Sequence, residues 1–285
     1  MLVAGQEVSV LGLLALGSVV GLVAGLFGIG GGFILTPLLS VVFDIPLPVA
    51  IGSGLCQMVG TATVAFLKHR KLGQGEPRFD GLMLAGTLLG VAAGARVVAH
   101  LERRGDTTLV LYVAYIVFLL GVALTLVRPS RGPVEALSVV RRGPLARIPL
   151  PPYVDFPQLP LRRVPALVVA YLGLALGFLS GLLGVGGGVA LIPILLYGFG
   201  FPIRHAAGTG ILVLFATSVS GTIAHARLGH VHLPLALTLL AGSSISTQFG
   251  ALATHRLPVN VLRRGLALLI LGTVAALAWA LARRL

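Results

Sequence analysis

The stretch "GLFGIGGG" at residues 25–32 decides the fold, because five of its eight residues are glycine and it lies inside a long apolar run. A second stretch, "GLLGVGGG", occupies residues 181–188. Each glycine in a helix interior costs about 1 kcal/mol relative to alanine, so glycine at this density predicts that the helix breaks. In the first stretch we expect a new helix to begin at about residue 33.

The whole chain has the composition of an integral membrane protein. Hydrophobic residues make up 56% of its 285 residues and charged residues only 10%, whereas soluble domains carry about 25% charged residues. The formal net charge is +13, but lysine and arginine fall in short clusters between apolar runs. Such clusters are typical of polytopic membrane proteins and not of a nucleic-acid-binding face. The sequence therefore predicts an all-α, multi-pass protein of the cell (inner) membrane, with the lipid bilayer and not nucleic acid as its partner.

Two of the eight apolar runs are too long for one crossing, which takes about 20 residues. These runs, 8–43 and 164–200, each contain one glycine stretch. If each long run crosses once, a half has four crossings; if it breaks and returns, a half has five and the second half is inverted. We favour inverted repeats, with the glycine-broken helices meeting near the bilayer centre. Both counts put the basic segment between the halves in the cytoplasm.

The halves repeat one another at a fixed offset of 156 residues. "GLVAGLFGIGGGFILTPLL" (21–39) and "GFLSGLLGVGGGVALIPIL" (177–195) share ten of 19 positions, and the register continues without a gap. An ungapped register of this length indicates an internal duplication. We expect a first membrane repeat at 1–127, a Pro/Arg-rich cytoplasmic linker at 128–163 and a second membrane repeat at 164–285.

The glycine stretches predict an anion site made from backbone. Unwound backbone at membrane depth is tolerated only where it is buried in protein or lines a cavity. The first N–H groups of the following helix have no intrahelical partner, and the helix dipole favours negative charge there. The alternative is that glycine only allows close helix packing, as the spacing of Gly21 and Gly25 suggests. The predicted substrate-binding glycines, facing one another across a central pocket, are Gly28, Gly30, Gly31, Gly32, Gly184, Gly186, Gly187 and Gly188.

Polar side chains in other runs supply further candidates for substrate binding. Ser53 and Thr209 are equivalent positions of the two halves, and Gln57 and Gln248 add amide groups. Hydroxyl and amide donors suit the oxygens of a small anion without demanding a formal charge. The alternative is that these side chains only hold helices together.

Two equivalent histidines are candidates for gating or a proton-linked switch, because histidine titrates near neutral pH. His69 and His225 lie at the ends of equivalent apolar runs. The eight acidic residues lie at run ends or in connections, which makes carboxylates poor candidates for coupling.

The two glycine stretches each precede a proline-containing segment, and the second half also contains "SGTIAHARLGHV" (220–231) and "QFGA" (248–251). In these motifs the chain resembles the TauE/SafE family of sulfite exporters and related sulfur-oxyanion permeases. The resemblance covers both halves and implies a secondary transporter for sulfite, a sulfonate or a related small sulfur-containing or organic anion.

No motif indicates a cofactor, a metal site or catalytic residues. The glycine stretches lack the ending of a P-loop and the spacing of a dinucleotide fingerprint, and no zinc-ligand motif such as HExxH is present. A membrane-embedded enzyme and a non-transporting accessory protein are the alternatives to a transporter. The sequence leaves open which anion is carried, the direction, the coupling ion and the oligomeric state, for which a homodimer is one option.

Overall fold

The computed structural model describes residues 1–3, 5–27, 30–71, 76–127, 143–156, 161–254 and 259–283. Eight helices within these residues are long and apolar enough to cross a membrane, which confirms the polytopic all-α fold. The first half contains α1 (Val10–Phe27), α2 (Gly32–Val42), α3 (Leu47–Lys71), α4 (Pro77–Arg104) and α5 (Thr107–Val127). The second contains α6 (Ala166–Leu183), α7 (Gly188–Pro193), the π-helical turn η3 (Ile194–Phe199), α8 (Ile203–Ala226), α9 (Leu233–Thr254) and α10 (Val259–Ala282).

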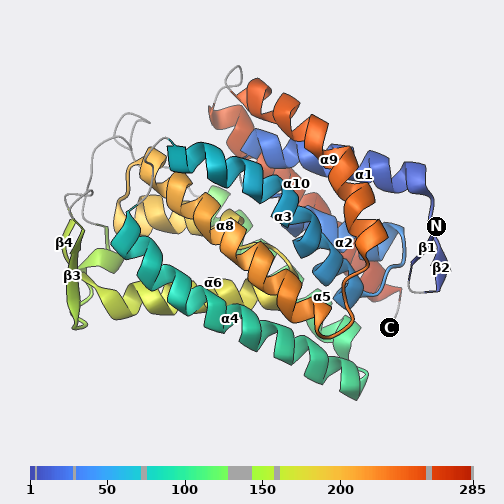
Figure 1. Ribbon diagram of the computed structural model, residues 1–285, viewed down its shortest axis with the longest axis horizontal. Coiled ribbons are helices and arrows are strands. Elements are labelled where there is room, and N and C mark those ends of the chain that lie inside the picture. Colours follow the sequence, from blue (N-terminus) through green and yellow to red (C-terminus); the bar gives the residue numbers. More distant parts are fainter. Residues whose placement is uncertain are drawn as a thin grey trace.

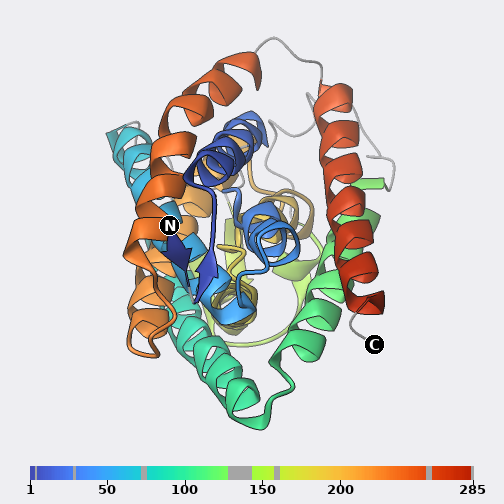
Figure 2. The same cartoon turned by 90° about the vertical axis from the view of Figure 1, so that its right-hand side faces the viewer.

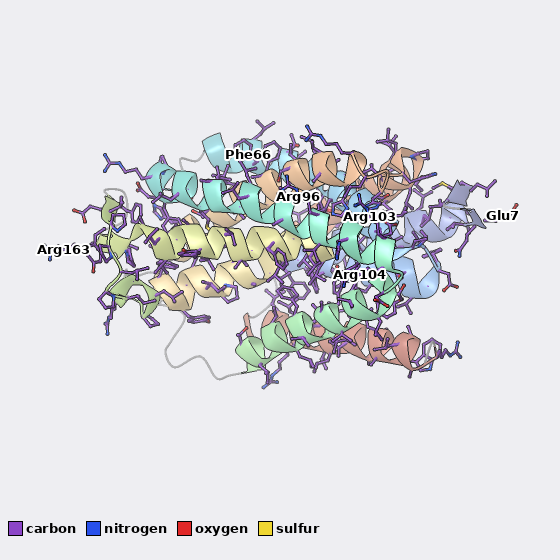
Figure 3. All side chains as sticks on the ribbon, turned by 90° about the horizontal axis from the view of Figure 1, so that it is seen from below. Glu7, Phe66, Arg96, Arg103, Arg104 and Arg163 are labelled. Atoms are coloured by element: carbon purple, nitrogen blue, oxygen red, sulfur yellow. The ribbon has the colours of Figure 1, made fainter. Side chains whose placement is uncertain are left out.

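A short β-hairpin precedes the first helix of each half. The first consists of β1 (Leu2–Val3) and β2 (Gln6–Glu7), and the second of β3 (Tyr153–Phe156) and β4 (Leu161–Pro165), which follows the 3₁₀ turn η2 (Leu145–Arg147). The two hairpins lie at opposite ends of the molecule (Figure 1). Glu7 and Arg163 mark these two ends in Figure 3. The first helices of the two halves therefore start from opposite ends.

Both long apolar runs are broken, as predicted. α1 ends at Phe27 and α2 begins at Gly32, while α6 ends at Leu183 and α7 begins at Gly188. Gly28, one of the predicted site residues, lies outside the described residues. After each break the chain turns back into the interior, and Figure 2 shows α2 inside a ring of longer helices.

Each short helix returns to the end from which its run started. Phe43, directly after α2, lies against the first turn of α1, where a Cβ on Gly12 would be 3.1 Å from the Phe43 ring. In the second half, the ring of Phe199 lies 5.4 Å from that of Phe79, which is also 5.4 Å from Phe156 of β3. Each long run is thus a hairpin of one full-length helix and one shorter, buried helix.

The helices pack in pairs that combine one helix of the first half with one helix of the second. We call these the exchanged pairs. α1 packs along α9, and α6 packs along α4 (Figure 1). A Cβ on Gly17, Gly21 or Gly25 would collide with the backbone of α9. Small residues at this spacing let membrane helices approach closely. The packing interpretation is therefore confirmed for Gly21 and Gly25. Equivalent glycines of α6 approach the backbone of α4 in the same way, namely Gly173, Gly177 and Gly181.

Candidate functional site

The glycine breaks of the two halves meet in the interior. A Cβ on Gly32 would lie 2.5 Å from the carbonyl oxygen of Gly184, so the two backbones are in direct contact. The side chain of Leu214, on α8, reaches both breaks: its Cδ1 would be 2.8 Å from a Cβ on Gly30 and 2.6 Å from one on Gly186. The structure therefore brings together Gly30, Gly32, Gly184 and Gly186 of the predicted site, whereas Gly31 packs against Val20 of α1.

The backbone at the breaks adopts conformations that favour glycine. The φ angles are +75° at Gly30, +72° at Gly184, +74° at Gly186 and +78° at Gly187. Residues with a Cβ pay a steric penalty in this left-handed region, which glycine avoids. These turns interrupt the hydrogen-bond ladder and let each chain reverse direction within the protein interior.

The start of α7 presents unpaired N–H groups at the meeting point. Those of Gly186, Gly187 and Gly188 donate to no acceptor among the described residues, whereas Leu191 N donates to Gly187 O at 3.2 Å. Such groups at a helix start are ready donors for an anion. α7 continues into η3, so that Gly188–Phe199 forms one short apolar helix behind these donors.

Apolar side chains fill the space between the breaks, which corrects the expectation of a central polar pocket. Met58 and Leu214 are equivalent positions of α3 and α8 under the 156-residue offset, and both are buried, with 1% and 7% exposure. The Met58 sulfur would lie 2.7 Å from a Cβ on Gly32. These two equivalent side chains therefore meet over the two equivalent breaks. The structure is closed at this point.

Three hydroxyl groups that were not among the predicted site residues surround the breaks. The Thr217 hydroxyl donates to Gly186 O at 3.0 Å, and the Tyr115 hydroxyl donates to Leu183 O. Thr36 on α2 is fully buried and faces the Tyr115 hydroxyl, but it makes no hydrogen bond of standard geometry. Their only sequence signal is a polar residue inside an apolar run, as with Thr36 in "FILTPLL".

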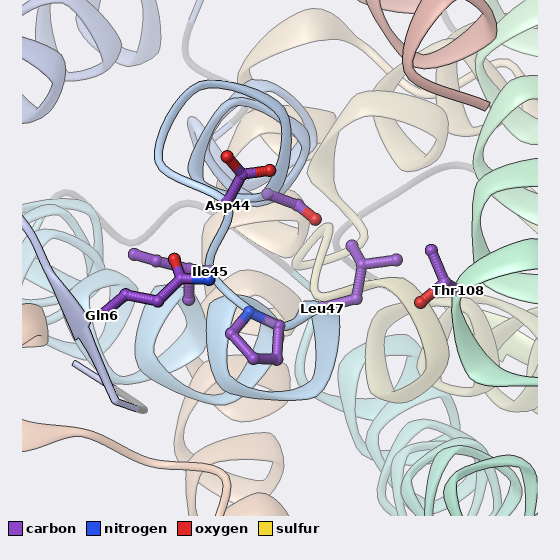
Figure 4. A pocket seen from close by; sticks show the side chains of 7 residues that line it. Gln6, Asp44, Ile45, Leu47 and Thr108 are labelled. Atoms are coloured by element: carbon purple, nitrogen blue, oxygen red, sulfur yellow. The ribbon is translucent and has the colours of Figure 1, made fainter. Parts of the chain in front are cut away.

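A column of hydroxyl groups leads from these residues to a pocket at one end of the molecule. Ser40, on α2, lies one helical turn after Thr36, and Tyr112, on α5, lies one turn before Tyr115. Ser40 Oγ is 3.0 Å from Tyr112 Oη. All four side chains are buried. The pocket has a volume of about 430 Å³ at the β1–β2 end (Figure 4). It is lined by Gln6, Ser40, Asp44, Ile45, Pro46, Leu47 and Thr108.

Ser53 and Gln57, two of the polar residues predicted to bind substrate, form hydrogen bonds to the second half of the protein. Ser53 Oγ accepts a hydrogen bond from His232 N at 3.0 Å, and Gln57 Nε2 donates to Ser243 Oγ at 2.7 Å. Gln248 is exposed on α9. Among the described residues, no hydrogen bond joins any of Ser53, Gln57, Thr209 and Gln248 to a glycine break.

Thr209 is bonded to a carboxylate from the other half. Its hydroxyl donates to Asp80 Oδ1 at 2.6 Å. Asp80 lies in the first turn of α4, where the sequence placed it at a run end, but only 8% of it is exposed. The neighbouring Glu76 is also buried, at 2% exposure. A run-end position in the sequence therefore does not make these carboxylates solvent-exposed.

Of the two candidate histidines, only His225 can be placed, because the side chain of His69 lies outside the described residues. The His225 ring is buried and bonds Gly181 O through Nε2 at 2.8 Å and His230 Nδ1 through Nδ1 at 3.0 Å. His230 Nε2 is 2.8 Å from Glu102 Oε2. Among the described residues, no group of three or more His, Cys, Asp or Glu side chains is arranged to hold a metal ion.

Comparisons with known proteins agree with the observed architecture. The family model described as sulfite exporter TauE/SafE matches residues 13–277. The chain is 26% identical over 263 residues to the probable membrane transporter protein YunE of Bacillus subtilis, covering 88% of this chain and 90% of that protein. It is also 26% identical over 277 residues to a probable membrane transporter protein of Haemophilus influenzae, covering 90% and 94%. No solved structure matches the chain.

The family match spans both halves, both glycine breaks and all eight candidate membrane helices in whole or in part. The relatives carry the name of membrane transporters, which points away from an enzyme. The chain is thus a multi-pass membrane protein that belongs to the sulfite exporter TauE/SafE family.

Proposed function

We propose that the protein is a secondary transporter that carries sulfite, a sulfonate or a related small sulfur-containing or organic anion across the inner membrane. Membership of a family of named membrane transporters supports the general activity. One observation carries the proposal: a glycine break from each half meets the other, and the N–H groups of Gly186, Gly187 and Gly188, in the second break, have no acceptor within the part of the chain that the structure describes.

The donors at the breaks suit an oxyanion. Backbone N–H groups and the Thr36 hydroxyl can donate to oxygen without adding a formal positive charge, and the hydroxyls of Tyr115 and Thr217 can do so only when they release Leu183 O and Gly186 O. Hydrogen bonds to a charged group contribute about 1.5–3 kcal/mol each, so a few suffice for binding that is still readily reversible. The apolar part of a sulfonate would contact Met58 and Leu214, which must first move apart to admit the anion.

The column of Ser40, Tyr112, Thr36 and Tyr115 supplies the route to this site. It joins the pocket at the β1–β2 end to the carbonyl of Leu183, directly before the second break. With the linker in the cytoplasm, as its charge predicts, this pocket opens to the outside. The other end of the molecule would open when the anion leaves on the cytoplasmic side.

We infer that the two halves are inverted relative to each other, since their first helices start from opposite ends. Inverted repeats with broken helices around a central site are a recurrent transporter design. The glycine contacts lock α1 to α9 and α4 to α6, so the moving bodies would be these exchanged pairs. A movement of one intact half against the other would have to pull the pairs apart.

Exchange across proteoliposomes tests the function. Vesicles containing the purified protein are loaded with sulfite, methanesulfonate, thiosulfate or chloride, and counterflow of each labelled anion is measured. We expect counterflow of at least one sulfur anion. The other sulfur anions should inhibit this counterflow by competition, and chloride should not inhibit it. Counterflow of no sulfur anion by folded protein, or equal inhibition by chloride, would contradict the proposal.

A further inference from the structure

A chain of hydrogen bonds runs from the protein surface to the backbone just before the second glycine break. It passes from Glu102 on α4 to His230, then to His225 on α8, and ends at Gly181 O of α6. The three distances are 2.8, 3.0 and 2.8 Å. The side chain of Glu102 is 50% exposed and that of His230 only 5%, while His225 is fully buried. This series of hydrogen bonds therefore connects solvent with the interior of the protein.

If all three hydrogen bonds form and Glu102 is ionised, the hydrogen-bonded network Glu102–His230–His225 holds one proton more than two neutral imidazoles supply. A carbonyl oxygen only accepts, so the bond to Gly181 O requires a hydrogen on Nε2 of His225. The bond between the two Nδ1 atoms requires one hydrogen, and the bond to an ionised Glu102 requires another on Nε2 of His230. Three hydrogens are thus needed on four ring nitrogens, and two neutral rings carry only two. The extra proton makes one imidazolium, which the Glu102 carboxylate balances.

This extra proton has two positions. If Nδ1 of His230 carries it, the charge lies beside Glu102 near the surface; if Nδ1 of His225 carries it, the charge lies in the interior beside Gly181 O. A transfer between the two Nδ1 atoms, 3.0 Å apart, interchanges these states without moving a heavy atom. Without the extra proton, one of the three hydrogen bonds is lost, and the hydrogen-bonded link between Glu102 and Gly181 O is interrupted.

The surroundings add no other charged group to the buried part of the chain. His225 packs on α3, where a Cβ on Gly52 would lie 3.1 Å from the His225 Cβ, and neither α6 nor α3 near Gly52 carries a charged residue. His232, in the same connection after α8, accepts from Leu235 N through its own Nδ1. On α4 the exposed residues flanking Glu102 are His100, Arg103 and Arg104, and on the α8 side Arg227 is exposed. Figure 3 shows Arg103 and Arg104 nearer to Glu7 than to Arg163.

We propose that Glu102, His230 and His225 form a proton-binding site that couples anion transport to proton movement. The proposal rests on the transport function above and adds the coupling ion. The site lies at the β1–β2 end, as the pocket does, so a proton and an anion would enter from the same side. The proton binds from solvent at His230, moves to His225, and fixes or releases the last turn of α6, whose Leu183 carbonyl meets Tyr115 beside the break.

Two kinds of flux in the same vesicles test the coupling. Counterflow at equal pH needs no net proton movement. Net uptake of the anion under an imposed pH gradient does need net proton movement if the two are coupled. The probe is whichever of sulfite, methanesulfonate and thiosulfate gives the fastest counterflow, with external pH constant and only internal pH varied. For one proton per anion, a gradient of one pH unit should change the accumulation ratio by about tenfold.

Substitutions test whether the response to the pH gradient depends on the hydrogen-bonded residues Glu102, His230 and His225. We expect Glu102→Gln and His230→Gln to keep counterflow and lose the response to the gradient, whereas the neighbouring exposed substitution His100→Gln keeps both. An unchanged gradient response in the two variants, or no response in the unmodified protein, would overturn the proton site and leave the transporter intact. Absence of counterflow in the unmodified protein would instead overturn the proposed function. Because the result for the unmodified protein needs no substitution, a variant that fails to fold does not hide the answer.

Discussion

Substitution of Gly32 by alanine tests the contact between the two breaks most directly. The new Cβ would lie 2.5 Å from Gly184 O and 2.7 Å from the Met58 sulfur. The sulfur lies in a flexible side chain that can move away, but the Gly184 oxygen belongs to the backbone. Ordinary contact begins at 3.4 Å, so the two breaks must separate by about 0.9 Å. The substitution therefore moves the proposed donors of one half away from those of the other.

Two energies decide the outcome. Overpacking of an interior costs about 1–3 kcal/mol, while replacing a helical glycine by alanine returns about 1 kcal/mol. The net loss of stability is thus small enough for the variant to fold. Loss of one hydrogen bond to the bound anion costs about 1.5–3 kcal/mol, which corresponds to a rise in Kd of about 10- to 150-fold. The expected loss of anion affinity, about 1.5–3 kcal/mol, is thus at least comparable to the net loss of folding stability of about 0–2 kcal/mol.

The assay is anion uptake into proteoliposomes, with thermal unfolding in detergent measured on the same samples. Gly272→Ala is the matched control, because Gly272 is also a helical glycine and nothing lies within 4 Å of its added Cβ. We expect Gly272→Ala to leave KM unchanged and Gly32→Ala to raise it strongly. A folded Gly32→Ala protein with the KM of the unmodified chain would refute a site at the meeting point of the breaks.

Three further substitutions have defined outcomes. Tyr115→Phe removes a buried hydrogen bond to the end of α6, so unfolding stability should fall by about 1 kcal/mol and KM for the anion should rise. Thr209→Val leaves the Asp80 carboxylate without its hydroxyl donor, and thermal unfolding should show a loss of about 1–3 kcal/mol, against no loss for the exposed hydroxyl control Thr238→Val. Leu214→Ala enlarges the space between the breaks, and competition assays should show a relative gain for bulkier sulfonates over sulfite; an unchanged order of preference would contradict a site beside Leu214.

The sequence predicted the elements of the fold because each has a local signal. The density of glycine predicted the helix breaks before Gly32 and Gly188. The i,i+4 spacing of Gly21 and Gly25 predicted a close contact between helices. Both depend on backbone properties that neighbouring residues determine. The exchange of helices between the halves has no such signal, because it depends on which distant backbone each glycine meets.

The side chains of the site were harder to predict. A polar residue in an apolar run is visible in the sequence, but its partner depends on how the helices cross. The sequence thus identified Gln57 and Ser53 as polar residues inside apolar runs but not their partners, Ser243 and His232. Met58 and Leu214 were missed for the opposite reason: a methionine or leucine in an apolar helix looks like any other core residue.

The exchanged pairs also set the order in which the molecule can be assembled. α9 begins at Leu233, roughly 200 residues after α1 ends at Phe27. At synthesis rates of about 5–20 residues per second, α1 would wait roughly 10–40 s for its partner. Throughout that interval its glycine face is open to lipid or to a chaperone. Insertion of the protein into the bilayer must therefore keep an early helix available until almost the entire chain has been made.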